Sequence, residues 1–311
     1  MNMPANAFAQ STLDPDRPEV AANSPLRVFY WCVRRELWES RSLYLGPLGI
    51  AGLYLLGFLF YLPAIPRTMR AAMAAEHGFN RDLIAQPFNY LSLAVMGIAF
   101  LISLLYSVET LYAERRDRSI LFWKSMPVSD LTVVLSKASI PILFLPLLCF
   151  VITVVAQYLM LMLSSVVLLG ANLSVATLWS ELALFRTLLM LLYHLVTIHM
   201  LWYAPIYAYL LLVSAWARRV PLLWAILPPV AILILEKAFF HTSFFHHLIG
   251  WRFSGGPEAQ MPDLTTGYPI HPAMHPTPLH FFATPSMWLG LLFAAACLLA
   301  AARLRRNREP V

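Results

Sequence analysis

The chain contains 311 residues, of which only 12% carry a charge and 59% are apolar, and its formal net charge is +6. Soluble domains carry about 25% charged residues, so this composition excludes a soluble enzyme, a disordered protein and a fibre. Most basic residues lie in short segments between apolar runs, where membrane topology accounts for them without a nucleic acid partner. We therefore predict an all-α integral membrane protein whose partners include the lipid bilayer and no nucleic acid.

The first 24 residues differ from the rest of the chain because they are polar and contain several prolines. They have neither the basic start nor the apolar stretch of a signal peptide. We interpret residues 1–24 as a disordered cytoplasmic tail and residues 25–308 as one transmembrane domain. The three cysteines, Cys32, Cys149 and Cys297, lie far apart in sequence, and we expect them to be free thiols.

Residues 25–41 precede the first apolar run and have the spacing of a helix that lies in the membrane interface. The apolar stripe consists of Leu26, Phe29, Tyr30, Val33 and Leu37, and Arg27, Arg34 and Arg41 repeat every seven residues along one flank. Trp31 and Trp38 lie off this stripe. A simple anchor that precedes the first span is the alternative interpretation.

Apolar runs of the length that crosses a bilayer, about 20 residues, occur six times. The predicted spans cover about 43–62, 90–108, 139–162, 187–213, 220–235 and 285–302. The uncharged residues 164–180 then form an external or interfacial segment, and Pro205 predicts a kink in the fourth span. Six spans place both termini on the same side of the membrane.

The distribution of basic residues predicts the orientation of these spans. Sixteen of the 22 Lys and Arg residues fall in the segments that lie inside if the N-terminus is inside, and six fall outside. We therefore predict a multi-pass protein of the inner (plasma) membrane with both termini in the cytoplasm. No charged residue lies in the middle of a span, which argues against a secondary transporter driven by protons or sodium.

The loop between the second and third spans, residues 112–137, has the most informative pattern. Glu114 precedes Arg118 by four residues, the favourable order for an ion pair on a helix. An apolar group follows: Ile120, Leu121, Phe122, Trp123 and Met126. Pro127 ends this helix, and Ser129 or Asp130 can cap the next one. Exposed aromatic residues on an inner loop require a cover, which is a partner protein, the membrane or the chain's own bundle.

This loop resembles the motif that follows the second span of ABC-2 type permeases, the membrane subunits of ATP-binding cassette exporters. The matching positions are Glu114, Arg115, Leu121, Ser125, Pro127, Val128, Ser129 and Lys137. The chain has Arg118 and Ser119 where the family usually has Gly and Thr, which makes the turn less flexible. In that family the loop holds a coupling helix that docks on a cytoplasmic ATPase.

The resemblance implies the function, the partners and the site. The chain would be the permease subunit of an exporter, a dimer with a second permease chain (a homodimer in preference to a heterodimer) driven by two copies of an ABC ATPase subunit. The coupling site would consist of Glu114, Arg115, Arg118, Leu121, Phe122, Trp123, Pro127 and Lys137. ATP and magnesium would be bound by the partner, because the sequence has no phosphate-binding Gly-x-x-x-x-Gly-Lys-Ser/Thr loop. We therefore expect no catalytic residue, no enzyme activity and no cofactor on this chain.

The segment before the last span divides into two parts. Residues 238–253 are rich in aromatic side chains, which is typical of a re-entrant or interfacial hairpin, and the remainder is rich in proline. Six of the nine histidines lie in or beside these parts: His241, His246, His247, His271, His275 and His280. A membrane-embedded metalloprotein or metalloenzyme is therefore the alternative function. We predict no metal site, because the prolines leave no rigid element to hold the ligands.

Overall fold

The computed structural model describes residues 24–75, 79–120, 123, 128–256 and 278–307, and these residues form helices and their connections without a strand. Six helical segments are long and apolar enough to cross a membrane. They are Ser42–Met73, Arg81–Arg116, Asp130–Gly170, Val175–Trp202, Pro221–Phe240 and Pro285–Asn307. The chain is therefore a multi-pass membrane protein, as the composition predicts.

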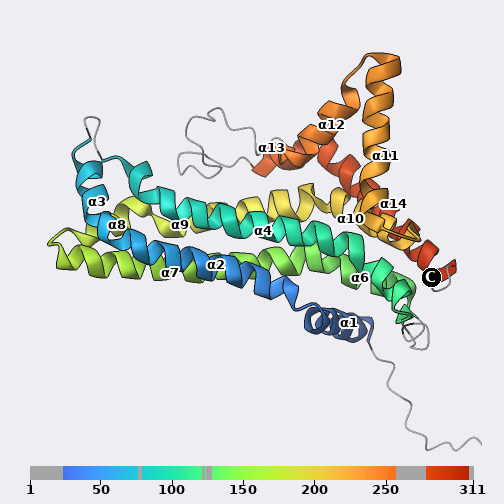
Figure 1. The fold of residues 1–311 in the computed structure, drawn as a ribbon, viewed down its shortest axis with the longest axis horizontal. Helices are drawn as coiled ribbons and strands as arrows, with labels where there is room; N and C mark the ends of the chain where they lie inside the picture. Colours follow the sequence, from blue (N-terminus) through green and yellow to red (C-terminus); the bar gives the residue numbers. More distant parts are fainter. Residues whose placement is uncertain (1–23, 76–78, 121–122, 124–127, 257–277, 308–311) are drawn as a thin grey trace, which may run out of the picture.

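The long helices lie side by side along the longest dimension of the molecule (Figure 1). They are α2 (Ser42–Tyr61), α4 (Arg81–Arg116), α6 (Asp130–Ser139) with α7 (Leu145–Gly170), and α9 (Leu184–His194) with α10 (Ala204–Trp216). Their shared core contains Leu91, Val95, Cys149 and Met160, all fully or almost fully buried. The core thus joins α4 to α7 along the bundle.

Two π-helical turns interrupt the bundle, each beside a proline. Pro141 lies in η2 (Ile140–Phe144), and Pro205 follows η3 (Leu195–Trp202). Proline lacks the backbone N–H that continues a helix, and beside Pro205 the Ile206 N–H donates to Tyr203 O instead (2.9 Å). Where the sequence predicts a kink at Pro205, the structure has an interruption at Tyr203, between η3 and α10.

The third span is longer than its predicted range of 139–162. Its helix continues to Gly170, because Ser164 and Ser165 donate their hydroxyl protons to carbonyls one turn earlier, at 2.7 and 2.8 Å. These serines therefore need no water and do not end the helix. At the same end of the bundle lie α8 (Val175–Leu182), η1 (Leu62–Ala64) and α3 (Ile65–Met73).

The opposite end of the bundle, called the terminal end below, holds both the first and the last described helices (Figure 1). The last helix, α14 (Pro285–Asn307), follows α13 (Pro278–Ala283) and packs against α10 through small side chains. These are Ala208, Ala294 and Cys297 in one cluster, and Ala215, Ala301 and Ala302 in another. All three cysteines, Cys32, Cys149 and Cys297, are free and buried.

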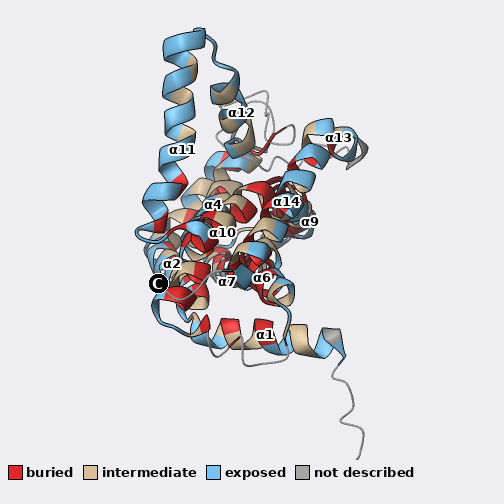
Figure 2. Ribbon diagram, turned by 90° about the vertical axis from the view of Figure 1, so that its right-hand side faces the viewer, coloured by how far each residue is buried: buried red, intermediate tan, exposed pale blue. Residues whose placement is uncertain are grey.

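Helix α1 (Pro25–Glu39) lies across the bundle axis at the terminal end (Figures 1 and 2). Ser24 caps its first turn by accepting a hydrogen bond from Arg27 N–H. The expected membrane-facing stripe is divided in the structure: Val33 is buried in the protein core, whereas Leu26 and Tyr30 are exposed. The apolar stripe therefore serves mainly to attach α1 to the bundle.

Three consecutive helices form an arm that leaves the bundle: α11 (Pro221–Leu235), η4 (Glu236–Phe240) and α12 (Phe244–Phe253). In Figures 1 and 2, α11 stands across the bundle axis and α12 returns toward the bundle. The predicted fifth span is thus an apolar helix, but it does not run beside the other spans. The hairpin includes α11 as well as the predicted 238–253.

Arg252 fastens the end of the arm to the bundle. Its guanidinium donates to Trp202 O (3.2 Å) and Ser286 O (2.9 Å) and lies 4.2 Å from the centre of the Trp202 ring. The Trp202 indole N–H donates back to Arg252 O (3.0 Å). Gly290 makes room for this contact, because a Cβ there would lie 2.5 Å from Arg252 Nη2. We call these residues the arm latch.

Candidate functional site

The terminal end contains a network of buried charged side chains, called the terminal network below. Its members come from four separate helices: Glu36 from α1, Glu114 from α4, Asp130 and Lys137 from α6, and Arg305 from α14. Except for the half-buried Asp130, each of these residues is at most 6% exposed. Buried charges require partners, so the network fixes how these helices meet.

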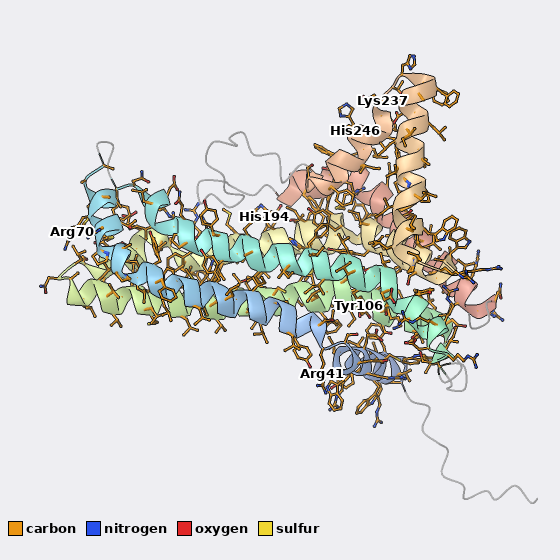
Figure 3. All side chains as sticks on the ribbon, in the orientation of Figure 1. Arg41, Arg70, Tyr106, His194, Lys237 and His246 are labelled. Carbon is orange, nitrogen blue, oxygen red and sulfur yellow. The ribbon has the colours of Figure 1, made fainter. Side chains whose placement is uncertain are left out.

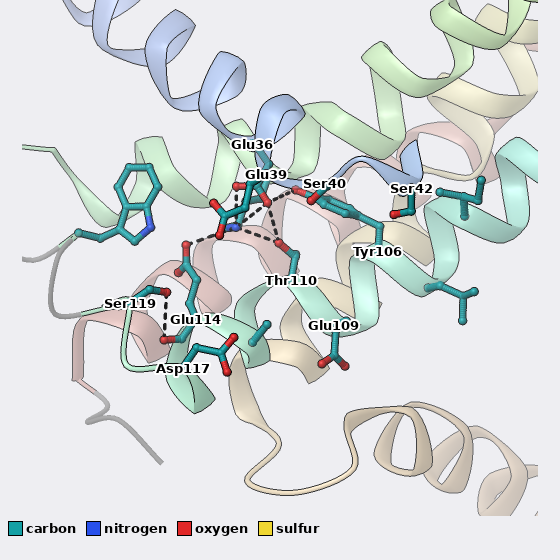
Figure 4. A pocket seen from close by; sticks show the side chains of 15 residues that line it. Glu36, Glu39, Ser40, Ser42, Tyr106, Glu109, Thr110, Glu114, Asp117 and Ser119 are labelled. Atoms are coloured by element: carbon teal, nitrogen blue, oxygen red, sulfur yellow. Dashed lines mark hydrogen bonds and ion pairs between the residues drawn. The ribbon is translucent and has the colours of Figure 1, made fainter. Parts of the chain in front are cut away.

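Glu36 and Lys137 form the centre of the terminal network, and Figure 4 shows Glu36 beside Tyr106 and Thr110. Lys137 Nζ lies 2.8 and 2.9 Å from the two carboxylate oxygens of Glu36. Tyr106 and Thr110, one turn apart on α4, donate hydroxyl protons to Glu36 Oε1 at 2.7 and 3.1 Å. Lys137 also donates to Thr110 Oγ1 (2.8 Å). The ion pair is therefore satisfied by neutral hydroxyl groups as well as by opposite charge.

Glu114 extends the network to the last helix. Its Oε1 lies 3.3 Å from Lys137 Nζ, and its Oε2 accepts from Arg305 Nη2 at 2.9 Å. Arg305 Nη1 in turn donates to Asp130 Oδ1 at 2.6 Å. The guanidinium thus bridges two carboxylates, Glu114 near the end of α4 and Asp130 at the start of α6, the geometry for which arginine is suited.

The electrostatic environment keeps Glu36 ionised. Burial alone would raise the pKa of this carboxyl group, but the charge of Lys137 and hydrogen bonds from Lys137, Tyr106 and Thr110 outweigh burial. The pKa of Glu36 is consequently below its ordinary value of 4.5. Glu36 is therefore ionised at neutral pH.

A cavity of about 370 Å³ lies beside the network (Figure 4). Glu36, Tyr106, Thr110, Glu114 and Lys137 line it, together with Trp123 and the acidic residues Glu39, Glu109 and Asp117. The acidic residues outside the network already have partners: Arg35 for Glu39, and Arg116 for Glu109 and Asp117. The helices α1, α4 and α6, which contribute most of the lining residues, are therefore not tightly packed beside the network.

Arg115 has a different position from the one that the sequence predicts. Instead of contributing to an exposed surface, it is 3% exposed and donates to Ser214 O (2.8 Å) and Ala217 O (2.5 Å). These carbonyls lie at the end of α10, where a helix leaves acceptors without partners. Arg115 therefore joins α4 to the end of α10 and is not available to a partner protein.

Trp123 is also buried, which corrects the expectation of an exposed aromatic surface. It is 4% exposed and packs with Cys32 of α1 and Val133 of α6, and the Arg35 guanidinium lies 4.5 Å from its ring centre. The sequence allowed a partner protein, the membrane or the chain's own bundle to cover this side chain. In the structure the bundle covers it. Leu121, Phe122 and Pro127 lie outside the described residues.

The loop begins with a turn at Arg118. This residue has a φ of 56°, in the left-handed region that favours glycine, and Gly is the usual residue at this position of the ABC-2 motif. The predicted ion pair between Glu114 and Arg118 is wrong, because α4 ends at Arg116 and Glu114 pairs with Lys137 and Arg305. The predicted cap is confirmed: Ser129 accepts from Thr132 N–H at the start of α6.

The sequence interpretation brought Glu114 and Lys137 into one site but missed Glu36, Asp130, Arg305, Tyr106 and Thr110. One signal for Glu36 was present: it lies on the same helical face as Phe29 and Val33, where a charge is unfavourable without a partner. Arg305 follows Ala301 and Ala302 on the packed face of α14. A charged residue that continues the apolar face of a helix thus predicts a buried ion pair.

The histidines are dispersed in the described part of the chain. His194 lies in the bundle and His246 on the arm (Figure 3), and the rings of His246 and His247 are 5.8 Å apart. Among the described residues, no group of three or more His, Cys, Asp and Glu side chains could hold a metal ion. His271 and His275 lie outside the described residues, and so does the side chain of His280.

Comparison with known proteins adds no relative to this description. No family model, curated protein or solved structure matches the chain.

Proposed function

We propose that this chain is the membrane-spanning permease subunit of an ATP-binding cassette exporter. In this proposal two permease chains pair, and two copies of a separate cytoplasmic subunit hydrolyse ATP with bound magnesium. The protein resides in the inner membrane with both termini in the cytoplasm. The permease itself binds no nucleotide and has no catalytic residue.

One observation carries the proposal: the first and last residues of the loop motif meet in space. Glu114 and Lys137 are separated by the whole loop in sequence, yet their charged atoms lie 3.3 Å apart. Lys137 also pairs with Glu36, and Glu114 also pairs with Arg305. Force applied to this loop would reach α1, α4, α6 and α14 through ion pairs. The left-handed turn at Arg118, where the motif has Gly, supports the same proposal.

The orientation follows from charge. The segments with most of the basic residues gather at the terminal end, where Arg41 lies, whereas Arg70 is at the opposite end (Figure 3). The side with more Lys and Arg faces the cytoplasm in membrane proteins. We therefore assign the terminal end to the cytoplasm, the side on which an ATPase is available.

The test is capture of the ATPase. The tagged full-length chain is solubilised in mild detergent from its native membrane, and the proteins that co-purify with it are identified. We expect one protein with a phosphate-binding loop, in an amount equal to that of the permease. Recovery of a stable, folded permease without any such protein, including after chemical cross-linking in the membrane, would contradict the proposal.

Variants of the turn locate the contact. Arg116, Asp117 and Arg118 are exposed at the start of the loop, so Arg118→Glu reverses a charge there without opening the core. We expect Arg118→Glu to reduce capture strongly and Arg118→Lys to preserve it. Trp123→Asp is not a suitable variant, because Trp123 is buried. A buried Asp would unfold the loop, and the loss of ATPase capture would then not locate the contact.

A further inference from the structure

The side of α1 that faces away from the bundle has a regular alternation of arginine and tryptophan. Arg27, Trp31, Arg34 and Trp38 follow one another at intervals of four, three and four residues, which places them on one face of a helix. Trp31 is 51% and Trp38 71% exposed. The Arg34 guanidinium lies between them, 5.0 Å from the Trp31 ring and 4.9 Å from the Trp38 ring. We call this the outer face of α1.

The opposite face of α1 is already occupied. Cys32, Val33 and Glu36 are buried against the bundle, and Figure 2 shows the buried residues of α1 on the side toward the bundle and exposed residues on the other side. Lys137 holds Glu36 in this position. The outer face is therefore fixed in direction and cannot rotate into the protein.

Charge and side-chain chemistry select the ligand of this face. No carboxylate in the described part of the chain pairs with Arg27, Arg34 or the following Arg41, so the face has an unneutralised positive charge. Tryptophan concentrates at the headgroup level of bilayers, and arginine binds phosphate through several N–H groups. Because α1 lies across the bundle axis, the arginine and tryptophan side chains of its outer face lie at the same depth in the membrane.

We propose that the outer face of α1 binds the headgroups of anionic phospholipids at the terminal end of the bundle. Phosphates contact Arg27 and Arg34, while Trp31 and Trp38 insert beside the glycerol region. Because the same helix holds Glu36, bound anionic lipid stabilises the terminal network from outside. The proposal concerns this chain alone and does not depend on an ATPase partner.

The test uses the full-length chain in nanodiscs of phosphatidylcholine with increasing fractions of phosphatidylglycerol. Amide hydrogen exchange over α1 is measured at each fraction. We expect phosphatidylglycerol to slow this exchange and 0.5 M salt to weaken the effect, since exposed charges are screened. In the double variant Arg27→Gln/Arg34→Gln, the apparent affinity for phosphatidylglycerol should fall about 25-fold, given about fivefold per arginine. Arg27→Lys/Arg34→Lys keeps the charge but not the guanidinium, so it should weaken the response less than the double Gln variant.

A matched control removes two charges elsewhere at the same end. Arg303 and Arg306 of α14 are exposed, and Arg303→Gln/Arg306→Gln should leave the lipid dependence of α1 exchange unchanged. Equal exchange in both lipids for the unchanged chain would overturn the proposal. The proposal would also be overturned if both double Gln variants lost the same amount of lipid-dependent slowing of exchange, because this would indicate a general attraction between the basic chain and the anionic lipid. If Arg27→Gln/Arg34→Gln instead abolished capture of a protein partner in lipid-free detergent while lipid had no effect on exchange, the outer face would be a protein-docking surface.

Discussion

At the terminal end, four helices meet through paired charges, whereas the arm meets the bundle through a cation whose partners are backbone carbonyls. Glu36, Glu114 and Asp130 neutralise Lys137 and Arg305. Arg252, by contrast, has no carboxylate partner in the described part of the chain and contacts Trp202 and two carbonyl groups. Removing a member of the first arrangement leaves a buried charge, while disturbing the second leaves unfilled hydrogen bonds. The two regions should therefore respond very differently to substitution.

The largest effect is expected from Lys137→Met. This change leaves the carboxylate of Glu36 buried without its cation, and breaking such a pair costs about 3–5 kcal/mol. Unfolding of the purified chain in detergent, followed by circular dichroism, measures the loss. In the double variant Glu36→Leu/Lys137→Met we expect most of it to be recovered, because Glu114 still has Arg305. A single variant that is as stable as the unchanged chain would show that the pair is not buried.

A smaller effect is expected at the arm latch from Gly290→Ala. The new methyl group would meet the Arg252 guanidinium, which must move and give up its hydrogen bonds to the two carbonyl groups. Each lost hydrogen bond costs about 0.5–1.5 kcal/mol, and the helical gain from Gly to Ala, about 0.5–1 kcal/mol, offsets part of this cost. Amide exchange should increase over α12 and not at the terminal end. Gly97→Ala is the matched control, because no atom lies within 4 Å of a Cβ there, and it should stabilise α4 by about 0.5–1 kcal/mol. Equal exchange of α12 in both variants would argue against the latch.

Acid should loosen the terminal end through Glu36. The folded-state pKa of this group lies below its ordinary value of 4.5, so its contribution to the free energy of unfolding is complete above that value. The contribution is lost as the pH falls through the folded-state pKa, where Glu36 becomes neutral and the Lys137 charge loses its main partner. Measuring the free energy of unfolding of the unchanged chain and of Glu36→Gln from pH 7 downward isolates the contribution of Glu36. If the difference between the two chains did not change with pH, Glu36 would not be the group that loosens the terminal end.

The smallest effect, and the only one expected to stabilise the terminal end, is that of Arg118→Gly. Glycine adopts the left-handed conformation of this turn without a steric penalty, so we expect a gain of up to about 1 kcal/mol in the free energy of unfolding. Arg118→Val, which is branched at Cβ, should reduce it. Thermal unfolding of the three chains side by side is sufficient. The opposite order of stability would mean that the turn has another conformation.

The features that the sequence predicted depend on local patterns. Apolar length identifies the spans, Pro205 lacks an N–H group, and Ser129 precedes a helix that it can cap. Each of these signals lies within a few residues of the structure that it produces. The same locality explains the failure at Glu114, whose nearest opposite charge in the predicted helix was Arg118.

The terminal network was only partly predictable because its members are distant in sequence. Glu36 and Lys137 are separated by 101 residues, and Glu114 and Arg305 by 191. Such pairs depend on which helices become neighbours, and no local spacing reports that. The direction of α11 is a similar case, since its apolar composition suits a helix beside the bundle as well as one that leaves it.

The position of Arg305 near the end of the last helix has a consequence for biosynthesis. It is the last member of the terminal network to leave the ribosome, so the ion pairs of Glu114 and Asp130 with Arg305 cannot form until α14 has been made. A nascent chain that stops before this residue retains two carboxylates at the terminal end without their shared guanidinium. Glu114 then has only Lys137 as an ion-pair partner, and the half-buried Asp130 loses the guanidinium that it pairs with, so this end of the bundle is less stable. Docking of α14 thus completes the ion pairs of the terminal end.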